Sequence, residues 1–534
     1  MDSEFDVVLL DGYVDEPSTL GVPPYISPQI RMITGCLEEL KLTWKYITAD
    51  QYRKKGLPGS INTVVYGGVT VPGKYLRGSP LSPREVREIG TVDSETFLGG
   101  PIARYEDIGT FDHTVKKDMS AYIYEHLSGE GKDRWCRAHE MERWLKLGAK
   151  VVNEHPDHPD PLIAEIGLYR GCVRYLVGGC SFCSEPNYGK PRFRKIRDVV
   201  DEISALYSQG VRNFRIGGQS CTISYMAEGV GKKEVPKPRP ESIRGLFEGI
   251  WKECPGIKTL HLDNANPAVI STWPSESRRV LEILVKNTTP GNVLALGMES
   301  ADPEVIYKNN LNSTPEQVRE AVEIINRIGA TRGKNGMPML LPGLNFIGGL
   351  KGETKETYSK NFEFLEELKS EGMVLRRINI RQVLSHNEEF KMKHRQEFKK
   401  FKRRVREEID RPMLKRVVPR GTVVRDVYME KREGSKTFGR QIGTYPLLVG
   451  IEYPVELETY KDVIITDYGY RSITGLVHPF ELRKASYQEL KAVPGIGEKR
   501  AAKIFQEKPS SMEEMKNIVS NRQDLEKIMR YADL

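Results

Sequence analysis

The sequence has no long apolar runs and little cysteine. No apolar run approaches the ~18 residues of a membrane-spanning helix, so we expect no membrane segment. The acidic start, Met1-Asp-Ser-Glu, is not expected to act as a secretion signal. Seven cysteines in 534 residues are too few, and odd in number, for a disulfide scaffold. These absences predict a chain that works in a reducing cytoplasm.

Charge of one sign is not in large excess either. The formal net charge is +8, which allows an anionic partner without requiring one, so the positions of the basic residues matter more than their number. Hydrophobic residues make up 39% of the chain, enough for several cores. At roughly 150 residues per domain, the length predicts three or four domains.

Three of the seven cysteines, Cys172, Cys180 and Cys183, lie close together on a glycine-rich loop after the apolar run 162–168. Thiolates this close can hold one soft metal centre. A zinc site would want a fourth cysteine or histidine nearby, and the next cysteine, Cys221, lies far down the chain. An iron–sulfur cluster that keeps one iron open needs only three. The less favoured alternative is three buried apolar cysteines.

The pattern Cys172-x7-Cys180-x2-Cys183, with Phe182 before the last cysteine, resembles the cluster loop of the radical S-adenosylmethionine (SAM) superfamily. Its first spacing is longer than the common three residues. The resemblance implies that the three cysteines bind a [4Fe–4S] cluster, that SAM chelates the open iron, and that Phe182 lies beside the adenine. Family members cleave SAM reductively to a radical that abstracts hydrogen from an unactivated carbon. It also implies an electron donor of the ferredoxin or flavodoxin type, while the oligomeric state stays open.

Residues 1–150 predict a doubly wound, Rossmann-like domain. Its expected elements are strands at 6–10, 63–66 and 96–99 and a helix at 27–40. The domain resembles the cobalamin-binding-like domain that precedes many radical SAM cores. Members that bind cobalamin through histidine carry an Asp-x-His-x-x-Gly motif, which is missing here; the first histidine is His113. We therefore do not expect histidine-bound cobalamin.

Three further segments have weaker signals. Cys36 and Cys136 could belong to a second cluster, but burial is the favoured interpretation. Residues 113–150 are expected to be helical. Residues 155–161, in which histidine and aspartate alternate with proline, are expected to form an extended linker without a ligand role.

Residues 160–385 predict the catalytic core, a partial (βα)6 barrel of the α/β class. The expected strands are 162–168, 211–216, 258–262, 293–298, 340–347 and 378–383. The expected helices include 195–209, 275–287, 314–328 and 355–371, the third with proline at its first turn. In such barrels the chemistry gathers at the C-terminal ends of the strands.

The end of the second strand carries Gly217, Gly218 and Gln219, which resemble the Gly-Gly-Glu element that holds the methionine part of SAM. Glutamine in the third place is a departure from that element. Cys221, just beyond, is a candidate thiol or thiyl carrier, with a bystander role favoured. Asp263, after the third strand, could position a ligand or simply cap a loop, and both alternatives stay open.

The later strand ends complete the expected SAM site. Glu299 and Ser300 resemble the ribose-contacting stretch, and Asn345 opens a Gly-rich segment that resembles the family's fifth strand end. On the sixth strand, Asn379 and Arg381 supply polar groups where adenine and substrate would meet. We assign Cys221, Asn379 and Arg381 as candidate catalytic residues, and Arg381 also as a cofactor contact.

Residues 386–480 predict a basic helix followed by a small β-barrel of the TRAM or OB type. The helix has unbalanced positive charge, with Lys399, Lys402 and Arg403 as candidate phosphate contacts and the interleaved Phe398 and Phe401 in favour of RNA binding. A solvated structural helix is the alternative.

Residues 481–534 resemble a helix-hairpin-helix, with helices expected at 486–492 and 498–506. Gly495 and Gly497 would offer backbone N–H groups to a phosphate at a helix N-terminus, and Lys499 and Arg500 would add charge. The motif can also connect proteins, and nucleic acid is the favoured partner.

Together these features predict a cytoplasmic enzyme that modifies tRNA or another RNA at an unactivated carbon. Methyl transfer to a nucleoside such as threonylcarbamoyladenosine is the preferred chemistry. Methylthiolation resembles the architecture, but it would require three cysteines in residues 1–150, where only Cys36 and Cys136 are present. The remaining alternatives are modification of a protein or peptide, and a nucleic-acid-binding protein with a structural cluster.

Overall fold

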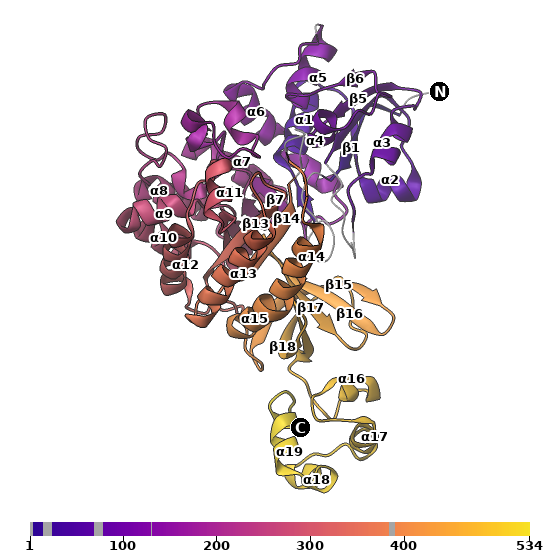
Figure 1. Cartoon of the computed structure of the whole chain (residues 1–534). Helices are drawn as coiled ribbons and strands as arrows, with labels where there is room; N and C mark the ends of the chain where they lie inside the picture. The colour runs from indigo at the N-terminus through magenta and orange to yellow at the C-terminus, as the bar shows by residue number, and fades with distance from the viewer. Residues whose placement is uncertain (1–3, 14–23, 69–77, 130, 384–389) are drawn as a thin grey trace. The chain divides into compact units, whose positions relative to one another are not determined.

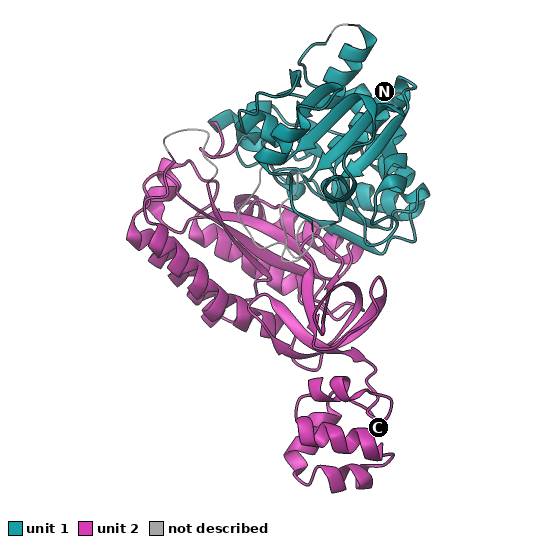
Figure 2. Ribbon diagram, turned by 90° about the vertical axis from the view of Figure 1, so that its right-hand side faces the viewer, with its two compact units in different colours: residues 1–177, 184–263 teal, residues 178–183, 264–534 magenta. Residues whose placement is uncertain are grey.

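The computed structural model describes residues 4–13, 24–68, 78–129, 131–383 and 390–534. The chain divides into two compact units, residues 1–177 with 184–263 and residues 178–183 with 264–534 (Figure 2). In the described residues, no helix combines the length and apolarity needed to cross a membrane. The expected domain limit at 385 lies outside the described residues.

The first unit begins with a five-stranded parallel sheet in the order β3-β1-β4-β5-β6, which is the order of flavodoxin-like doubly wound folds. Figure 1 labels β1, β5 and β6 of this sheet. Its strands are β1 (Phe5–Gly12), β3 (Trp44–Thr48), β4 (Ser60–Gly67), β5 (Glu95–Gly99) and β6 (His113–Thr114). Its helices are α1 (Pro28–Glu39), α2 (Ala49–Lys55), α3 (Pro83–Ile89), α4 (Pro101–Tyr105), α5 (Met119–Ser128) and α6 (Ala138–Leu147). The predicted doubly wound domain is confirmed.

Two local expectations in this unit are refined by the structure. Residues 113–150 are largely helical, but in two helices: α5 ends at Ser128, Gly129 follows with a φ of 146° that only glycine adopts readily, and α6 begins at Ala138. Residues 155–161 are not a free extended linker, because His155 is buried against Tyr46 and Asp160 accepts hydrogen bonds from Asn213 and Lys258. The segment is a packed connection instead.

The first half of the catalytic core also belongs to the first unit. Here β7 (Ile163–Ile166), β10 (Asn213–Ile216) and β11 (Thr259–Leu262) form a parallel sheet in the order β11-β10-β7-β2. β2 (Tyr25–Ile26), which precedes α1, adds to β7, so the N-terminal segment contributes a strand to the core sheet. The larger helices here are α7 (Ile196–Ser208) and α8 (Pro240–Glu253).

The second unit holds the other three predicted core strands in a parallel sheet, β12 (Asn292–Glu299), β13 (Leu340–Gly348) and β14 (Arg377–Gln382), in that order. Its helices are α9 (Pro267–Thr272), α10 (Pro274–Asn287), α11 (Pro303–Lys308), α12 (Pro315–Gly329) and α13 (Lys355–Ser370). As predicted, α12 starts with proline, and Thr314 caps it through the backbone N–H of Gln317.

The basic helix runs as α14 (Arg395–Arg404), a π-helical stretch (Val405–Asp410) and α15 (Arg411–Val417). A closed five-stranded barrel follows, in the order β15-β16-β17-β19-β18, with one parallel pair between β17 and β19. Its strands are β15 (Val423–Glu433), β16 (Lys436–Gln441), β17 (Leu447–Ile451), β18 (Tyr460–Tyr468) and β19 (Ser472–His478). This Greek-key closure is the architecture of small nucleic-acid-binding barrels of the OB class.

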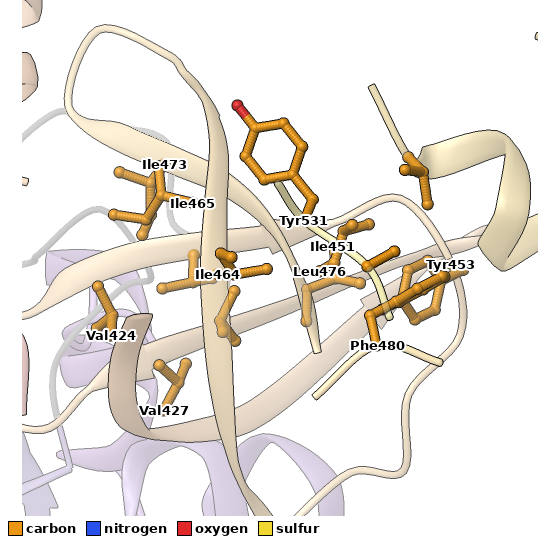
Figure 3. Packing of buried hydrophobic residues seen from close by; sticks show 14 of the residues in the cluster. Val424, Val427, Ile451, Tyr453, Ile464, Ile465, Ile473, Leu476, Phe480 and Tyr531 are labelled. Carbon is orange, nitrogen blue, oxygen red and sulfur yellow. The ribbon is translucent and has the colours of Figure 1, made fainter. Parts of the chain in front are cut away.

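The C-terminal tail forms α16 (Tyr487–Ala492), α17 (Glu498–Glu507), α18 (Met512–Ile518) and α19 (Arg522–Met529). Its apolar side chains continue the barrel core: Tyr531 belongs to the same cluster as Ile451, Ile464 and Leu476 (Figure 3). Leu482 and Phe480 also exchange backbone hydrogen bonds with Asp533, which ties the tail to the barrel exit.

Candidate functional site

The cysteine loop is held by specific local bonds on both sides. In the first unit, Cys172 is half-buried and accepts a hydrogen bond from the Arg174 backbone N–H at 3.4 Å. In the second unit, the N–H of Cys183 donates to the carbonyl of Cys180 at 3.0 Å, so these two thiols share one tight turn. Before that turn, Gly178 and Gly179 adopt φ of 77° and 67°, a conformation that glycine tolerates without strain.

The second half of the loop docks on the end of α11. The Asn310 amide donates to the carbonyl of Gly179 at 2.7 Å, and the Ser181 hydroxyl donates to Asn309 at 2.9 Å. Cys180 and Phe182 pack against an apolar cluster that contains Leu311. The loop is therefore positioned before any metal binds.

The donor set fits an iron–sulfur cluster. Each of the three cysteines is only half-buried within its own unit, so its sulfur is accessible to a ligand. Burial raises the pKa of the Cys172 thiol, and the N–H donated by Arg174 lowers it. Hydrogen bonds from backbone N–H groups to cysteine sulfur are also a means by which proteins tune cluster potentials.

In the first unit, the end of β10 forms the predicted glycine turn. Gly218 has a φ of 78°, and a Cβ on Gly217 would lie 2.9 Å from the Glu165 carboxylate. The buried Gln219 side chain accepts from the Leu168 N–H at 3.3 Å and donates to Thr222 at 2.9 Å. Gln219 thus ties the ends of β7 and β10 together, which leaves the backbone of the turn as the surface that a ligand could approach.

Two other predicted positions in this unit have local roles. The Cys221 thiol is buried, and its backbone carbonyl and N–H bond the Tyr169 hydroxyl at 2.7 and 2.9 Å. Asp263 forms an ion pair with Arg215, which supports the loop-structural alternative for Asp263.

In the second unit, Glu299 stands at a bulge at the end of β12 with a φ of 58°. Its Oε2 atom is buried and has no hydrogen-bond partner among the described residues. Burial raises the pKa of Glu299 to about 8. An orphaned buried carboxyl is costly unless a ligand satisfies it, and the hydroxyl groups of a ribose are suitable partners. This atom is the observation that fits SAM.

Neighbouring strand ends place further polar groups on the same sheet. Gly297, Asn345 and Asn379 are register partners across β12, β13 and β14. Asn379, with its amide oxygen turned toward Arg381, accepts a hydrogen bond from that guanidinium at 2.8 Å. Ser300 is used differently, because its hydroxyl accepts the N–H of Asp302, the N-cap residue of α11, at 3.2 Å. The structure thus groups Asn345, Asn379 and Arg381, whereas Ser300 has a structural bond.

Sequence reasoning missed a cavity of about 200 Å³ in the first unit. It lies where β4 and β5 end, lined by Tyr66, Gly100, Arg104, Lys117, Asp118 and Arg170 among others. The Arg170 guanidinium lies over the Trp135 ring at 5.3 Å and within 3.8 Å of Asp118. One signal in the sequence could have pointed to this cavity: Arg170 lies two residues before Cys172, the first cysteine of the loop.

One group in the described residues could hold an additional metal ion. Glu95 Oε1 lies 2.8 Å from His113 Nε2 and 2.9 Å from His126 Nε2. These distances equally describe a carboxylate that accepts two hydrogen bonds, so the group needs no ion.

The basic helix differs from its prediction in one respect. Phe398 and Phe401 are buried, and they pack on Tyr358 and Phe346 rather than facing RNA. The prediction that these rings support nucleic-acid contact was wrong, because their three-residue spacing places both on the inner face of the helix. The candidate cations Lys399, Lys402 and Arg403 are exposed on the outer face.

The helix-hairpin-helix turn has the expected shape, with Gly495 at a φ of 101° and Gly497 exposed before α17. Lys499 is exposed as well. Arg500 donates to the Gly495 carbonyl at 2.7 Å and pairs with Asp524 at 2.7 Å. Arg500 therefore connects the turn to α19, and its positive charge is paired with Asp524 within the motif.

Comparisons with known proteins agree with this arrangement. Residues 166–365 match the radical SAM superfamily model, and residues 481–507 match the helix-hairpin-helix motif. The chain belongs to the radical SAM superfamily, and it is an enzyme. The expected fold class, a partial (βα)6 barrel with a doubly wound domain, a small β domain and a helix-hairpin-helix, is confirmed.

Its relatives include two uncharacterized archaeal proteins. One, from Methanocaldococcus jannaschii, is 45% identical over 88% of this chain and 93% of its own length. The other, from Archaeoglobus fulgidus, is 42% identical over 91% and 93%. A tRNA-2-methylthio-N(6)-dimethylallyladenosine synthase from Lachnoclostridium phytofermentans is 25% identical over 58% of this chain and 60% of its own.

Among solved structures, the radical SAM methyltransferase TsrM from Kitasatospora setae is similar at a TM-score of 0.47 and 15% identity, over 70% of this chain and 72% of its own. Membership of the superfamily implies a [4Fe–4S] cluster and SAM. A second TsrM structure contains cobalamin. The comparisons give no support to our expectation that cobalamin is absent, and that expectation stays a prediction.

Proposed function

We propose that this enzyme modifies a tRNA nucleoside at an unactivated carbon, with methyl transfer as the preferred chemistry. The observation that carries the proposal is the combination, in one chain, of a radical SAM core with an exposed basic helix, a closed five-stranded barrel and a helix-hairpin-helix. Barrels of this class and helix-hairpin-helix turns contact nucleic-acid backbones without reading sequence. We place the enzyme in the cytoplasm, with a ferredoxin or flavodoxin as electron donor.

Each part of the chain has a proposed role. Cys172, Cys180 and Cys183 would hold the cluster, which together with SAM supplies a hydrogen-abstracting radical when bound. The Gly217–Gly218 backbone would approach the methionine part of SAM, and Glu299 would accept hydrogen bonds from ribose hydroxyls. Asn345, Asn379 and Arg381 would orient adenine and substrate. Methylation without histidine-bound cobalamin would use a second SAM as the methyl source.

Methylthiolation is the second candidate, because the tRNA methylthio synthase above is related over more than half of this chain. Only Cys36 and Cys136 precede Cys172 in the sequence, and a second cluster in that region would require three cysteines. Cys36 is also fully buried. Protein modification remains the third candidate, whereas a non-enzymatic cluster protein has lost its support with the family match.

The test is anaerobic. Protein reconstituted with iron and sulfide is mixed with SAM, dithionite and bulk tRNA, and 5′-deoxyadenosine and nucleoside masses are followed. A gain of one methyl group supports methylation, and a larger gain that contains sulfur supports methylthiolation. SAM cleavage without any change in RNA would redirect the search to protein substrates.

Two cysteine variants calibrate this test. Cys180→Ala should lose the cluster absorbance and reduce 5′-deoxyadenosine to background, because two thiolates cannot hold a cluster that requires three ligands. Cys254→Ala is the matched control, since Cys254 is a buried thiol at the C-terminal end of α8, outside the cysteine loop. Full activity of Cys180→Ala would contradict the assignment of the ligands.

A further inference from the structure

Four arginines from three segments of the second unit come together beside the barrel. Arg376 and Arg377 stand at the start of β14, Arg406 lies in the π-helical stretch between α14 and α15 (Figure 1), and Arg471 lies in the turn from β18 to β19. We call these four residues the arginine cluster. The guanidinium groups of the other three all act electrostatically on Arg471.

The arginine cluster is anchored by specific contacts. Arg406 donates to the carbonyl of Ile378 at 2.9 Å, and Arg377 stacks over the Tyr445 ring with its guanidinium carbon 3.6 Å from the centroid. Arg376 donates to the carbonyl of Pro446 at 3.3 Å, while its Nε is buried and has no hydrogen-bond partner among the described residues. The guanidinium groups are thus held near one another rather than dispersed in solvent.

The cluster's charge is not balanced. The carboxylate that faces it is Asp410, which pairs with Arg406. In the described part of the chain, Arg376, Arg377 and Arg471 have no carboxylate at ion-pair distance. Burial is the largest cause that lowers the pKa of Arg471 to about 9 and that of Arg376 to about 10; the neighbouring arginines lower both values further, whereas Asp410 raises them. A bound anion would offset the excess positive charge.

The surroundings indicate what that partner is. Lys402, on the exposed face of α14, lies within the electrostatic reach of Arg406 and Arg471, so the cluster continues the basic face of this helix. Tyr470, next to Arg471, is 51% exposed and offers a ring on which a base could stack. Arginine's fixed fork of donors matches phosphate oxygens, and π-helical stretches are frequent at functional sites.

We propose that Arg376, Arg406 and Arg471 form a binding site for one backbone phosphate of the RNA substrate. That the phosphate belongs to RNA rests on the proposed function. A free phosphate or a nucleotide would offer the same chemistry, and the experiment separates these sources. The site would hold the RNA at the junction of barrel and core, along the face of α14 that carries Lys402.

The experiment measures binding of fluorescently labelled bulk tRNA to the full-length protein by anisotropy, over a series of KCl concentrations. Arg471→Gln should weaken binding about tenfold at low salt and reduce the salt slope by about 1, the loss of one phosphate contact. Its melting temperature without RNA should not fall, because removing Arg471 relieves like-charge repulsion. Arg471→Lys should keep most of the slope but bind less tightly, since it lacks the fork.

Arg327→Gln is the matched control, because Arg327 is an exposed arginine on α12 paired with Glu323, and its affinity and slope should equal those of the wild type. Unchanged tRNA binding by a folded Arg471→Gln would overturn the inference.

Inorganic phosphate separates the two sources of the anion. If millimolar phosphate raises the melting temperature of the wild type but not of Arg471→Gln, and both proteins bind tRNA equally, the site takes free phosphate and the RNA assignment is wrong. A wild type that does not bind tRNA would overturn the proposed function together with this inference, whereas binding that is insensitive to Arg471 overturns this inference alone.

Discussion

The molecule contains two groups of arginines, one buried and one partly buried, and they differ in their counter-charges. In the first unit, Arg31 and Arg194 share Glu202, and Arg194 also pairs with Glu142 at 2.6 Å, so two positive charges meet two negative ones. In the second unit, the four residues of the arginine cluster face Asp410. The first arrangement is complete by itself, whereas the second leaves positive charge for another molecule.

The balanced group has a clear structural task. Arg31, on α1, donates to the carbonyls of Ile26 and Glu165, and Arg194 donates to the carbonyl of Gly167. Together with Glu202 on α7, these bonds fix β2 and the end of β7 close to the start of the cysteine loop. The contrast teaches that arginines matched by carboxylates support the fold, whereas arginines in excess over their carboxylates leave positive charge for a ligand.

The largest effect is expected when the balanced group is broken. Glu202→Gln leaves two buried guanidinium groups short of one counter-charge, which should lower the free energy of unfolding by about 3–5 kcal/mol. Urea unfolding followed by tryptophan fluorescence reports it, because Trp44, Trp135, Trp144 and Trp251 all lie in the first unit. Glu323→Gln, which breaks an exposed pair, should cost less than about 0.5 kcal/mol. Equal losses of stability in the two variants would show that the balanced group supports the fold no more than an exposed ion pair does.

A smaller effect is expected in the arginine cluster. Asp410→Asn takes away the carboxylate that faces the four arginines, and it should lower the free energy of unfolding by about 1–3 kcal/mol. Bulk tRNA should then raise the melting temperature of this variant more than that of the wild type, because a phosphate replaces the missing charge. Thermal unfolding with and without tRNA checks both statements. A variant that tRNA stabilises less than the wild type would count against a phosphate site.

A third effect develops with pH and concerns a carboxyl that lies outside both arginine groups. Burial raises the pKa of Glu299 to about 8 from an ordinary value of 4.5. Between these values the native state keeps a proton that the unfolded chain has lost, so its stabilising contribution is complete below about pH 4.5 and is lost as the pH rises to 8. The slope should not exceed about 1.4 kcal/mol per pH unit.

Glu299→Gln should abolish this part of the pH dependence, as measured by urea unfolding between pH 5 and 8. Glu202 provides the internal comparison. Burial alone would raise the pKa of Glu202, but the ion pairs with Arg194 and Arg31 outweigh burial and lower it. Glu202 should therefore contribute no slope in this range. An unchanged pH profile in Glu299→Gln would show that this carboxyl is already ionised in the native state.

Much of the fold could be predicted because local patterns determine it. The six core strands are short runs that are either mainly apolar or alternate apolar with polar residues, and α12 carries its proline and capping signals in sequence. β3 was missed, since Trp44–Thr48 mixes polar and apolar residues, and only its pairing with β1 makes it a strand. The helical expectation for residues 113–150 holds for α5 and α6, but it did not foresee the break between them, which begins at Gly129.

The candidate sites divide in the same way. The cysteine spacing and the residues at strand ends are visible in the sequence, and Glu299 could be named from its motif. Its orphaned oxygen could not, because that depends on what surrounds it in the folded unit. The arginine cluster was also out of reach, since Arg376, Arg406 and Arg471 lie 30 or more residues apart and only the docking of the barrel brings them together.

Arg406 also covers part of a sheet edge. β14 is the last strand of its three-stranded sheet, and such a strand exposes a row of backbone groups to which another chain could add. By donating to the Ile378 carbonyl, Arg406 occupies one of those groups. Replacing Arg406 would therefore leave the Ile378 carbonyl on the edge strand without this donor and would also remove one contact of the proposed phosphate site. Substitutions of the other cluster arginines would have only the second effect.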